Sequence, residues 1–144
     1  MTRRTYEFVQ VDAFTQTPLA VNPLAIFMDA RGLKDGEMQA LAREMNLSET
    51  TFIVPRDQAT EAPEGKQVRI FTVKEELSFA GHPTLGTALY LYAEQSVSGQ
   101  EHPGGITLDL ASGKIPVRFS VESGGVVNCV DGQVFGEMRQ RNPE

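Results

Sequence analysis

Hydrophobic and polar residues alternate with a period of two in several stretches of the chain, which indicates strands with one buried face. The first stretch, residues 5–14, places apolar side chains at alternate positions. Other stretches are apolar throughout, which is typical of short strands buried on both faces. These patterns predict strands at 5–14, 24–28, 48–54 and 67–73, with Pro55 ending the third.

Two stretches have the helical period instead. Residues 33–46 carry apolar side chains on one helical face, which predicts an amphipathic outer helix. Residues 83–95 are apolar nearly all round, which predicts a buried helix. The polar stretch 56–66 contains both Pro and Gly, and we expect a hairpin loop there.

Beyond residue 104, four short apolar runs separated by glycines predict a meander of antiparallel strands. The whole pattern indicates an α+β fold, in which a highly curved, mostly antiparallel sheet wraps around a central buried helix with one helix outside. No stretch has the composition of an interdomain linker, so residues 1–144 are expected to form a single domain.

Composition and charge exclude several classes of function. The net charge is −6 and no basic run occurs, which argues against nucleic acid as a partner. No apolar run reaches the length of a membrane span and no signal peptide is evident, so we expect no membrane association and a cytoplasmic location. The two histidines, His82 and His102, have no Cys or carboxylate at a ligand spacing, so no metal site is expected. The single cysteine, Cys129, is interpreted as a small buried hydrophobic residue.

A Gly-His-Pro sequence at the start of the buried helix is the first candidate site. Pro83 is favourable at a first helical position, which places the helix start at His82 or Pro83. Free N–H groups at a helix start bind carboxylates, Gly81 leaves their surroundings open, and His82 can exchange a proton near neutral pH. The alternative is ordinary turn chemistry with a capping histidine.

Ser48 and Glu49 form the second candidate, at the entry to an apolar strand. A carboxyl group that is half buried there is suited to general acid–base chemistry. Ser48 could bind a ligand carboxylate or hold the Glu49 side chain. The alternative is a solvated glutamate in a helix–strand loop.

The motifs "NLSET" and "FAGHPTLGTA", in this order, resemble the N-terminal half of the PhzF family of phenazine biosynthesis, which shares its fold with diaminopimelate epimerase. The resemblance implies a cofactor-independent isomerase that moves a proton between carbon atoms of a small carboxylic acid. It implies that Glu49 is the catalytic residue and that Ser48, Gly81 and His82 bind the substrate. Related epimerases carry a catalytic Cys at the position of Ala80, so a thiol mechanism is not expected here.

Members of that family have two similar halves with the active site between them, and this chain resembles only the first. The missing half is expected to be supplied by a second copy in a homodimer or by a separate second half-domain; a fragment of a longer protein is the third alternative. A non-catalytic half-domain that binds a small acid or a partner chain is the competing function.

Overall fold

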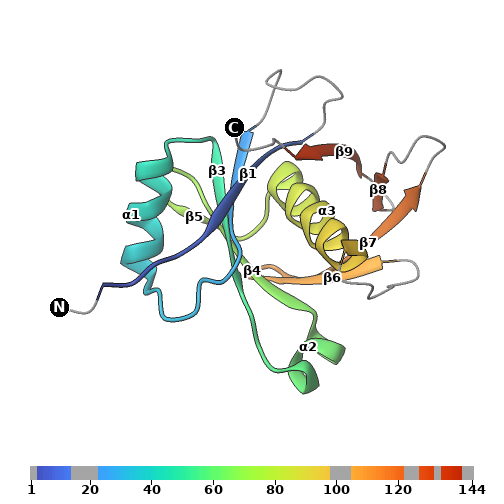
Figure 1. The fold of residues 1–144 in the computed structure, drawn as a ribbon, viewed down its shortest axis with the longest axis horizontal. Helices are drawn as coiled ribbons and strands as arrows, with labels where there is room; N and C mark the ends of the chain where they lie inside the picture. The colour runs from blue at the N-terminus through green and yellow to red at the C-terminus, as the bar shows by residue number, and fades with distance from the viewer. Residues whose placement is uncertain (1–2, 14–22, 98–104, 122–126, 132–133, 141–144) are drawn as a thin grey trace.

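The computed structural model describes residues 3–13, 23–97, 105–121, 127–131 and 134–140 (Figure 1). Its elements, in chain order, are β1 (Phe8–Ala13), β2 (Pro23–Phe27), α1 (Asp35–Met45), β3 (Glu49–Val54), α2 (Gln58–Glu64), β4 (Lys66–Phe71), β5 (Glu76–Leu77), α3 (Gly81–Val97), β6 (Gly105–Leu110), β7 (Gly113–Val121), β8 (Val127–Asp131) and β9 (Val134–Gln140).

The strands of the described residues form one sheet that closes on itself. The strand order is β3-β2-β1-β9-β8-β7-β6-β4-β5, and β3 also pairs with β4. The β2–β3 and β4–β6 pairs are parallel, and the remaining pairs are antiparallel. Helix α3 lies inside the curve of this sheet, whereas α1 lies outside it (Figure 1). The expected fold class, a curved sheet around a central helix, is therefore confirmed.

The inside of the sheet is filled by the apolar surface of α3. Leu85, Ala88 and Leu89 of the helix are buried against inward side chains of several strands, among them Val68 and Ile70. A helix that is buried on nearly every side needs apolar residues on nearly every side, which explains the composition of this segment.

Strand β3 separates the two cores because its side chains alternate between them. Ile53 packs in the inner core with α3, whereas Phe52 packs in the outer core beneath α1. In the outer core Phe52 stacks on Phe27 with ring centroids 4.9 Å apart and meets Phe71 edge-on at 5.4 Å. The alternation places Glu49 and Thr51 on the inner face, the same face as Ile53.

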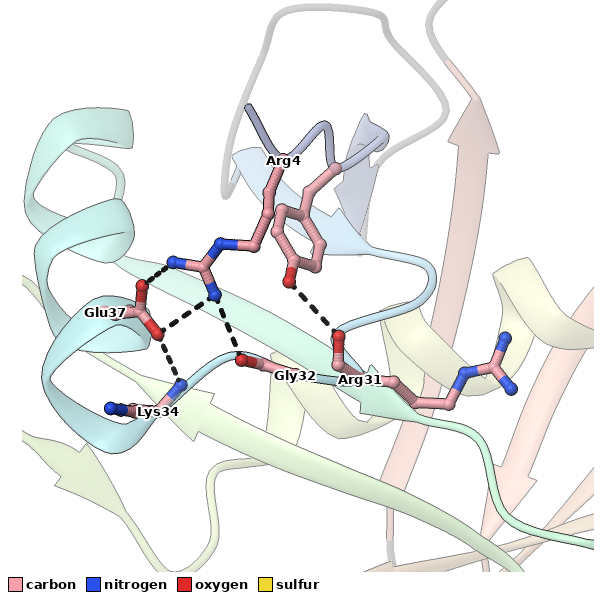
Figure 2. Close-up of polar contacts among 6 residues, drawn as sticks. Arg4, Arg31, Gly32, Lys34 and Glu37 are labelled. Carbon is pink, nitrogen blue, oxygen red and sulfur yellow. Dashed lines mark hydrogen bonds and ion pairs between the residues drawn. The ribbon is translucent and has the colours of Figure 1, made fainter. Parts of the chain in front are cut away.

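The N-terminal segment is fastened to the start of α1 (Figure 2). Arg4 forms an ion pair with Glu37 and donates to the carbonyl of Gly32 at 3.2 Å. Glu37 in turn accepts a hydrogen bond from the backbone N–H of Lys34, the N-cap residue, at 3.0 Å. The Tyr6 hydroxyl donates to the carbonyl of Arg31 at 3.2 Å. These contacts hold the chain before β1 across the β2–α1 connection.

The hairpin loop expected at 56–66 is wrong, because this segment contains helix α2. Its N-cap, Asp57, accepts a hydrogen bond from the backbone N–H of Thr60 at 2.8 Å. Pro63 lies near the end of the helix, and a sequence containing it favours a loop when considered alone. The local capping bond and tertiary contacts override that preference.

Those tertiary contacts come from Arg56, immediately before α2. Its guanidinium donates to the carbonyl of Gly65 at 2.8 Å and pairs with Asp109 of β6 at 3.1 Å. Gly65 ends the helix with φ +88°, and a Cβ there would lie 2.5 Å from the carbonyl oxygen of Thr107. Only glycine permits both this conformation and this approach.

The four strands expected after residue 104 are present as β6 to β9. The side chain of Cys129, in β8, lies outside the described part, as does the whole segment that contains His102. Among the described residues, no helix combines the length and the apolar character that crossing a bilayer requires.

Candidate functional site

Helix α3 begins at Gly81, slightly earlier than the sequence predicted. The backbone N–H of Thr84 donates to the carbonyl of Ala80 at 3.3 Å, and the Thr84 hydroxyl donates to the same carbonyl at 2.6 Å. Pro83 is therefore the third helical residue rather than the first. It still fits, because none of the first residues of a helix uses its N–H inside the helix.

Glu49, the first residue of β3, points inward to this helix start. Its Oε2 lies 3.3 Å from Nδ1 of His82, and only 18% of the Glu49 side chain and 14% of the His82 side chain are exposed. Strand pairing fixes Glu49 on one side, since it lies opposite Leu24 of β2. The structure thus brings together Glu49 and His82, which lie 33 residues apart in the chain.

The electrostatics of the pair are set mainly by burial. Burial lowers the pKa of His82, and the negative charge of Glu49 opposes that shift without cancelling it. The imidazole is therefore neutral at pH 7. The Glu49 Oε2 atom is buried, and no described residue makes a hydrogen bond to it. A buried carboxyl oxygen with unused hydrogen-bonding capacity can receive a proton from a ligand or return one to it.

The space in front of Gly81 is open. A Cβ at this position would meet no described atom within 4 Å, in contrast to the crowded Gly65. Gly81 is therefore not required for packing within the described chain. Phe79, two residues earlier, is 46% exposed, and Ser48 is also exposed. The roles of Ser48 and Gly81 in binding a substrate stay predictions.

Thr51 and Thr87, which were not predicted from the sequence, join β3 to α3 just behind the Glu49–His82 pair. Their hydroxyl oxygens lie 2.9 Å apart, and both residues are completely buried. The period-two pattern of β3 places Thr51 on the face of Glu49, and this was the available signal. Its partner on α3 could not be identified without the packing.

The depressed pKa of His82 predicts a pH-dependent stability. As pH falls below about 6.5, the unfolded chain takes up a proton at His82 more readily than the folded chain. The stability that the folded chain keeps while His82 is neutral is therefore fully present above about pH 6.5. It is lost as the pH falls towards the folded-state pKa of His82. The free energy of unfolding, measured by urea unfolding, should decrease less between pH 7.5 and pH 5 for His82→Asn than for the parent chain. Equal losses in the two proteins would contradict this prediction.

A concavity of about 650 Å³ lies at the other end of β2 from Glu49. Arg4 and Arg31, both labelled in Figure 2, are among the residues that line it. Arg31 pairs with Asp29 at 2.6 Å, and Arg4 pairs with Glu37, so both cations are already neutralised. Glu49 lies opposite Leu24, at the start of β2, so this concavity is separate from the Glu49–His82 site.

Comparison with known proteins identifies the family. The family model described as "Phenazine biosynthesis-like protein" matches residues 11–134, a range that includes Glu49, Gly81 and His82. The chain belongs to the PhzF family. It is 41% identical over 124 residues to the trans-2,3-dihydro-3-hydroxyanthranilate isomerase of Pseudomonas aeruginosa, which covers 86% of this chain and 41% of the relative.

Solved structures support the same family and fold. A PhzF-family protein of Bacillus anthracis is 30% identical with a TM-score of 0.70, over 88% of this chain and 40% of that protein. A probable proline racemase from Agrobacterium radiobacter is only 12% identical with a TM-score of 0.58, over 87% of this chain and 41% of that protein, and shows the shared fold alone. The chain thus spans about two fifths of the length of the relatives it matches.

Proposed function

We propose that this chain supplies one wall of the active site of a PhzF-family isomerase, in which Glu49 moves a proton between carbon atoms of a small carboxylic acid. One observation carries the proposal: the Glu49 carboxyl group is held at the start of α3, with a buried Oε2 atom that no described residue hydrogen-bonds. A general acid–base group needs such a position, within reach of a ligand and shielded from bulk water.

The geometry suggests a role for each neighbour. The carboxylate of a substrate would bind at the start of α3 beside Gly81, where the backbone N–H groups and the positive end of the helix dipole favour an anion. Glu49 would take a proton from one carbon, become neutral, and deliver a proton to another carbon, so that no atom is gained or lost. The proton on the neutral Glu49 carboxyl group can exchange with solvent before it is delivered, which lets deuterium enter the substrate. The neutral His82 ring would donate a hydrogen bond to the negative charge that develops on the substrate. No metal or cofactor is required by this sequence of steps.

The name of the Pseudomonas aeruginosa relative suggests a first substrate to test. Trans-2,3-dihydro-3-hydroxyanthranilate is a small carboxylic acid, as the proposed anion site requires. The test is incubation of this acid with the protein in deuterium oxide, followed by mass spectrometry and NMR of the recovered acid. Incorporation of deuterium at carbon supports the proposal. Recovery of the unchanged acid, when the acid has been shown to bind the protein, opposes it.

We further propose that a second half-domain covers the open side of the site, contributed by a second copy of this chain or by a separate segment. Three observations support this arrangement: a Cβ at Gly81 would meet no described atom within 4 Å, Phe79 is exposed two residues earlier, and the match covers only 41% of the Pseudomonas aeruginosa relative. For the homodimer, we expect sedimentation equilibrium to give a mass above the 15.8 kDa of one chain. A soluble 15.8 kDa species at all concentrations would contradict self-association and leave only the separate segment.

The competing function is a non-catalytic half-domain that binds a small acid or a partner chain. The coverage of only about two fifths of these two relatives supports it. Binding of the acid without deuterium incorporation, in the solution assembly of the protein, would favour this function. The cytoplasmic location expected from the sequence stays a prediction.

A further inference from the structure

The buried contact between Thr51 of β3 and Thr87 of α3 lies directly behind the Glu49–His82 pair. The two hydroxyl oxygens are 2.9 Å apart, and neither residue has any exposed surface. The surrounding inner core is apolar, so each hydroxyl depends on the other for the hydrogen bond that a buried polar group needs.

The Thr51–Thr87 contact lies at a similar distance from the Glu49–His82 contact along the strand and along the helix. Thr51 is two residues after Glu49 on the same face of β3, about 6.7 Å along the strand. Thr87 is five residues after His82, about 7.5 Å along the helix. Strand and helix touch through polar groups at two points, Glu49 with His82 and Thr51 with Thr87.

The strand itself cannot shift. Thr51 lies opposite Ile26 of β2 and Ile70 of β4, so β3 is paired on both edges. Helix α3, in contrast, is held to the sheet mainly by apolar contacts, which have no preferred direction. A directional hydrogen bond between the two elements fixes where the start of the helix lies relative to β3.

We propose that Thr51 and Thr87 are positioning residues, whose hydrogen bond holds His82 and the start of α3 at the working distance from the Glu49 carboxyl group. The proposal rests on the acid–base role proposed for Glu49 as far as catalysis is concerned. The positioning itself can be measured without turnover, because the charge of Glu49 acts on His82 and can be observed there.

The test is a cycle of His82 pKa values, measured by NMR of the imidazole ring protons. Glu49→Gln is introduced into the parent chain and into the double variant Thr51→Val/Thr87→Val, which removes both hydroxyls and preserves their shape. In the parent chain Glu49→Gln lowers the pKa of His82, because a charge that raises it is lost. In the double variant we expect the same change to have at most about half that effect, because the Coulomb interaction weakens with distance.

Thr50→Val is the matched control. Thr50 is equally buried on the same strand and next to Glu49, but its hydroxyl has no hydrogen-bond partner among the described residues. Its removal should leave the Glu49-dependent shift in the pKa of His82 unchanged. Thr51→Ser, which keeps the hydroxyl, should also behave as the parent chain.

Two outcomes would overturn the proposal. The first is an undiminished effect of Glu49→Gln in the double variant, which would show that the hydrogen bond is a packing feature only. The second is a Thr51→Ser variant that loses the effect as completely as Thr51→Val, which would show that the hydroxyl does not suffice and that the packing of the whole side chain sets the position. This comparison of single variants also serves if the double variant does not fold. A protein that fails to exchange deuterium but shows the expected pKa cycle would refute the proposed function and leave the positioning role standing.

Discussion

We expect the replacement of Glu49 with glutamine to abolish solvent-deuterium incorporation into the substrate carbon and to leave the fold intact. Glutamine has the size and shape of glutamate but cannot accept and return a proton at Oε2. General acid–base groups contribute roughly 10²- to 10⁴-fold to a rate, so the exchange rate should fall by at least about 10²-fold. The measurement is mass-spectrometric deuterium exchange into trans-2,3-dihydro-3-hydroxyanthranilate, with thermal unfolding measured in parallel.

Glu44→Gln serves as the control for this experiment. Glu44 lies on the exposed surface of α1, away from the site, so Glu44→Gln is the same substitution at a position without a proposed catalytic role. It should retain the exchange rate of the parent chain. Exchange that persists in Glu49→Gln would rule out the acid–base role, whereas a parent chain that binds the acid without exchange would favour the non-catalytic half-domain.

Replacing Gly81 with alanine weakens binding of the acid without weakening the fold. A Cβ at Gly81 meets no described atom within 4 Å, and Gly81 has no positive φ, so alanine fits the helix start. Stability should stay the same or rise by about 0.4–1 kcal/mol, because alanine restricts the unfolded chain. The added methyl group would occupy the space above the N–H groups that the proposed carboxylate contacts. We expect the affinity for 3-hydroxyanthranilate, an aromatic analogue of the acid, to fall by about tenfold or more, which corresponds to about 1.4 kcal/mol.

Gly36→Ala is a matched comparison for the change in stability. Gly36 also lies in the first turn of a helix, α1, and a Cβ there also meets nothing within 4 Å. Urea unfolding should give similar small changes for both variants, whereas calorimetric titration with 3-hydroxyanthranilate should distinguish them. Unaltered affinity in Gly81→Ala would show that no ligand approaches the helix start.

The local pattern of the chain was sufficient to predict most elements, whereas the assignment of Glu49, Gly81 and His82 to one site came from the resemblance to the PhzF family and stays a prediction. The helical period of residues 33–46 and the apolar composition of residues 83–95 correspond to α1 and α3. Side chains of β3 alternate between two cores, because the strand lies between them. The inward direction of Glu49 was therefore implicit in the sequence. Local periodicity carries this information because it records which side of an element is buried.

The sequence did not predict helix α2, because its stability depends on groups distant in the chain. The pairing of Arg56 with Asp109 and the approach of Gly65 to Thr107 join segments more than 40 residues apart. Within residues 56–66 alone, Pro63 and the polar composition favour a loop. Tertiary contacts decided the outcome against that local preference.

By itself, then, the sequence determined the period of each element and the residue types that occupy its buried face, including Glu49 on β3 and the Gly81–His82 start of α3. Only the tertiary structure decided that Glu49 and His82 touch, that burial outweighs the charge of Glu49 in setting the pKa of His82, and that Thr51 bonds to Thr87. The physical reason is that distance, desolvation and hydrogen bonding between α3 and β3 depend on how the closed sheet packs around the helix, and no local pattern along the chain records that packing.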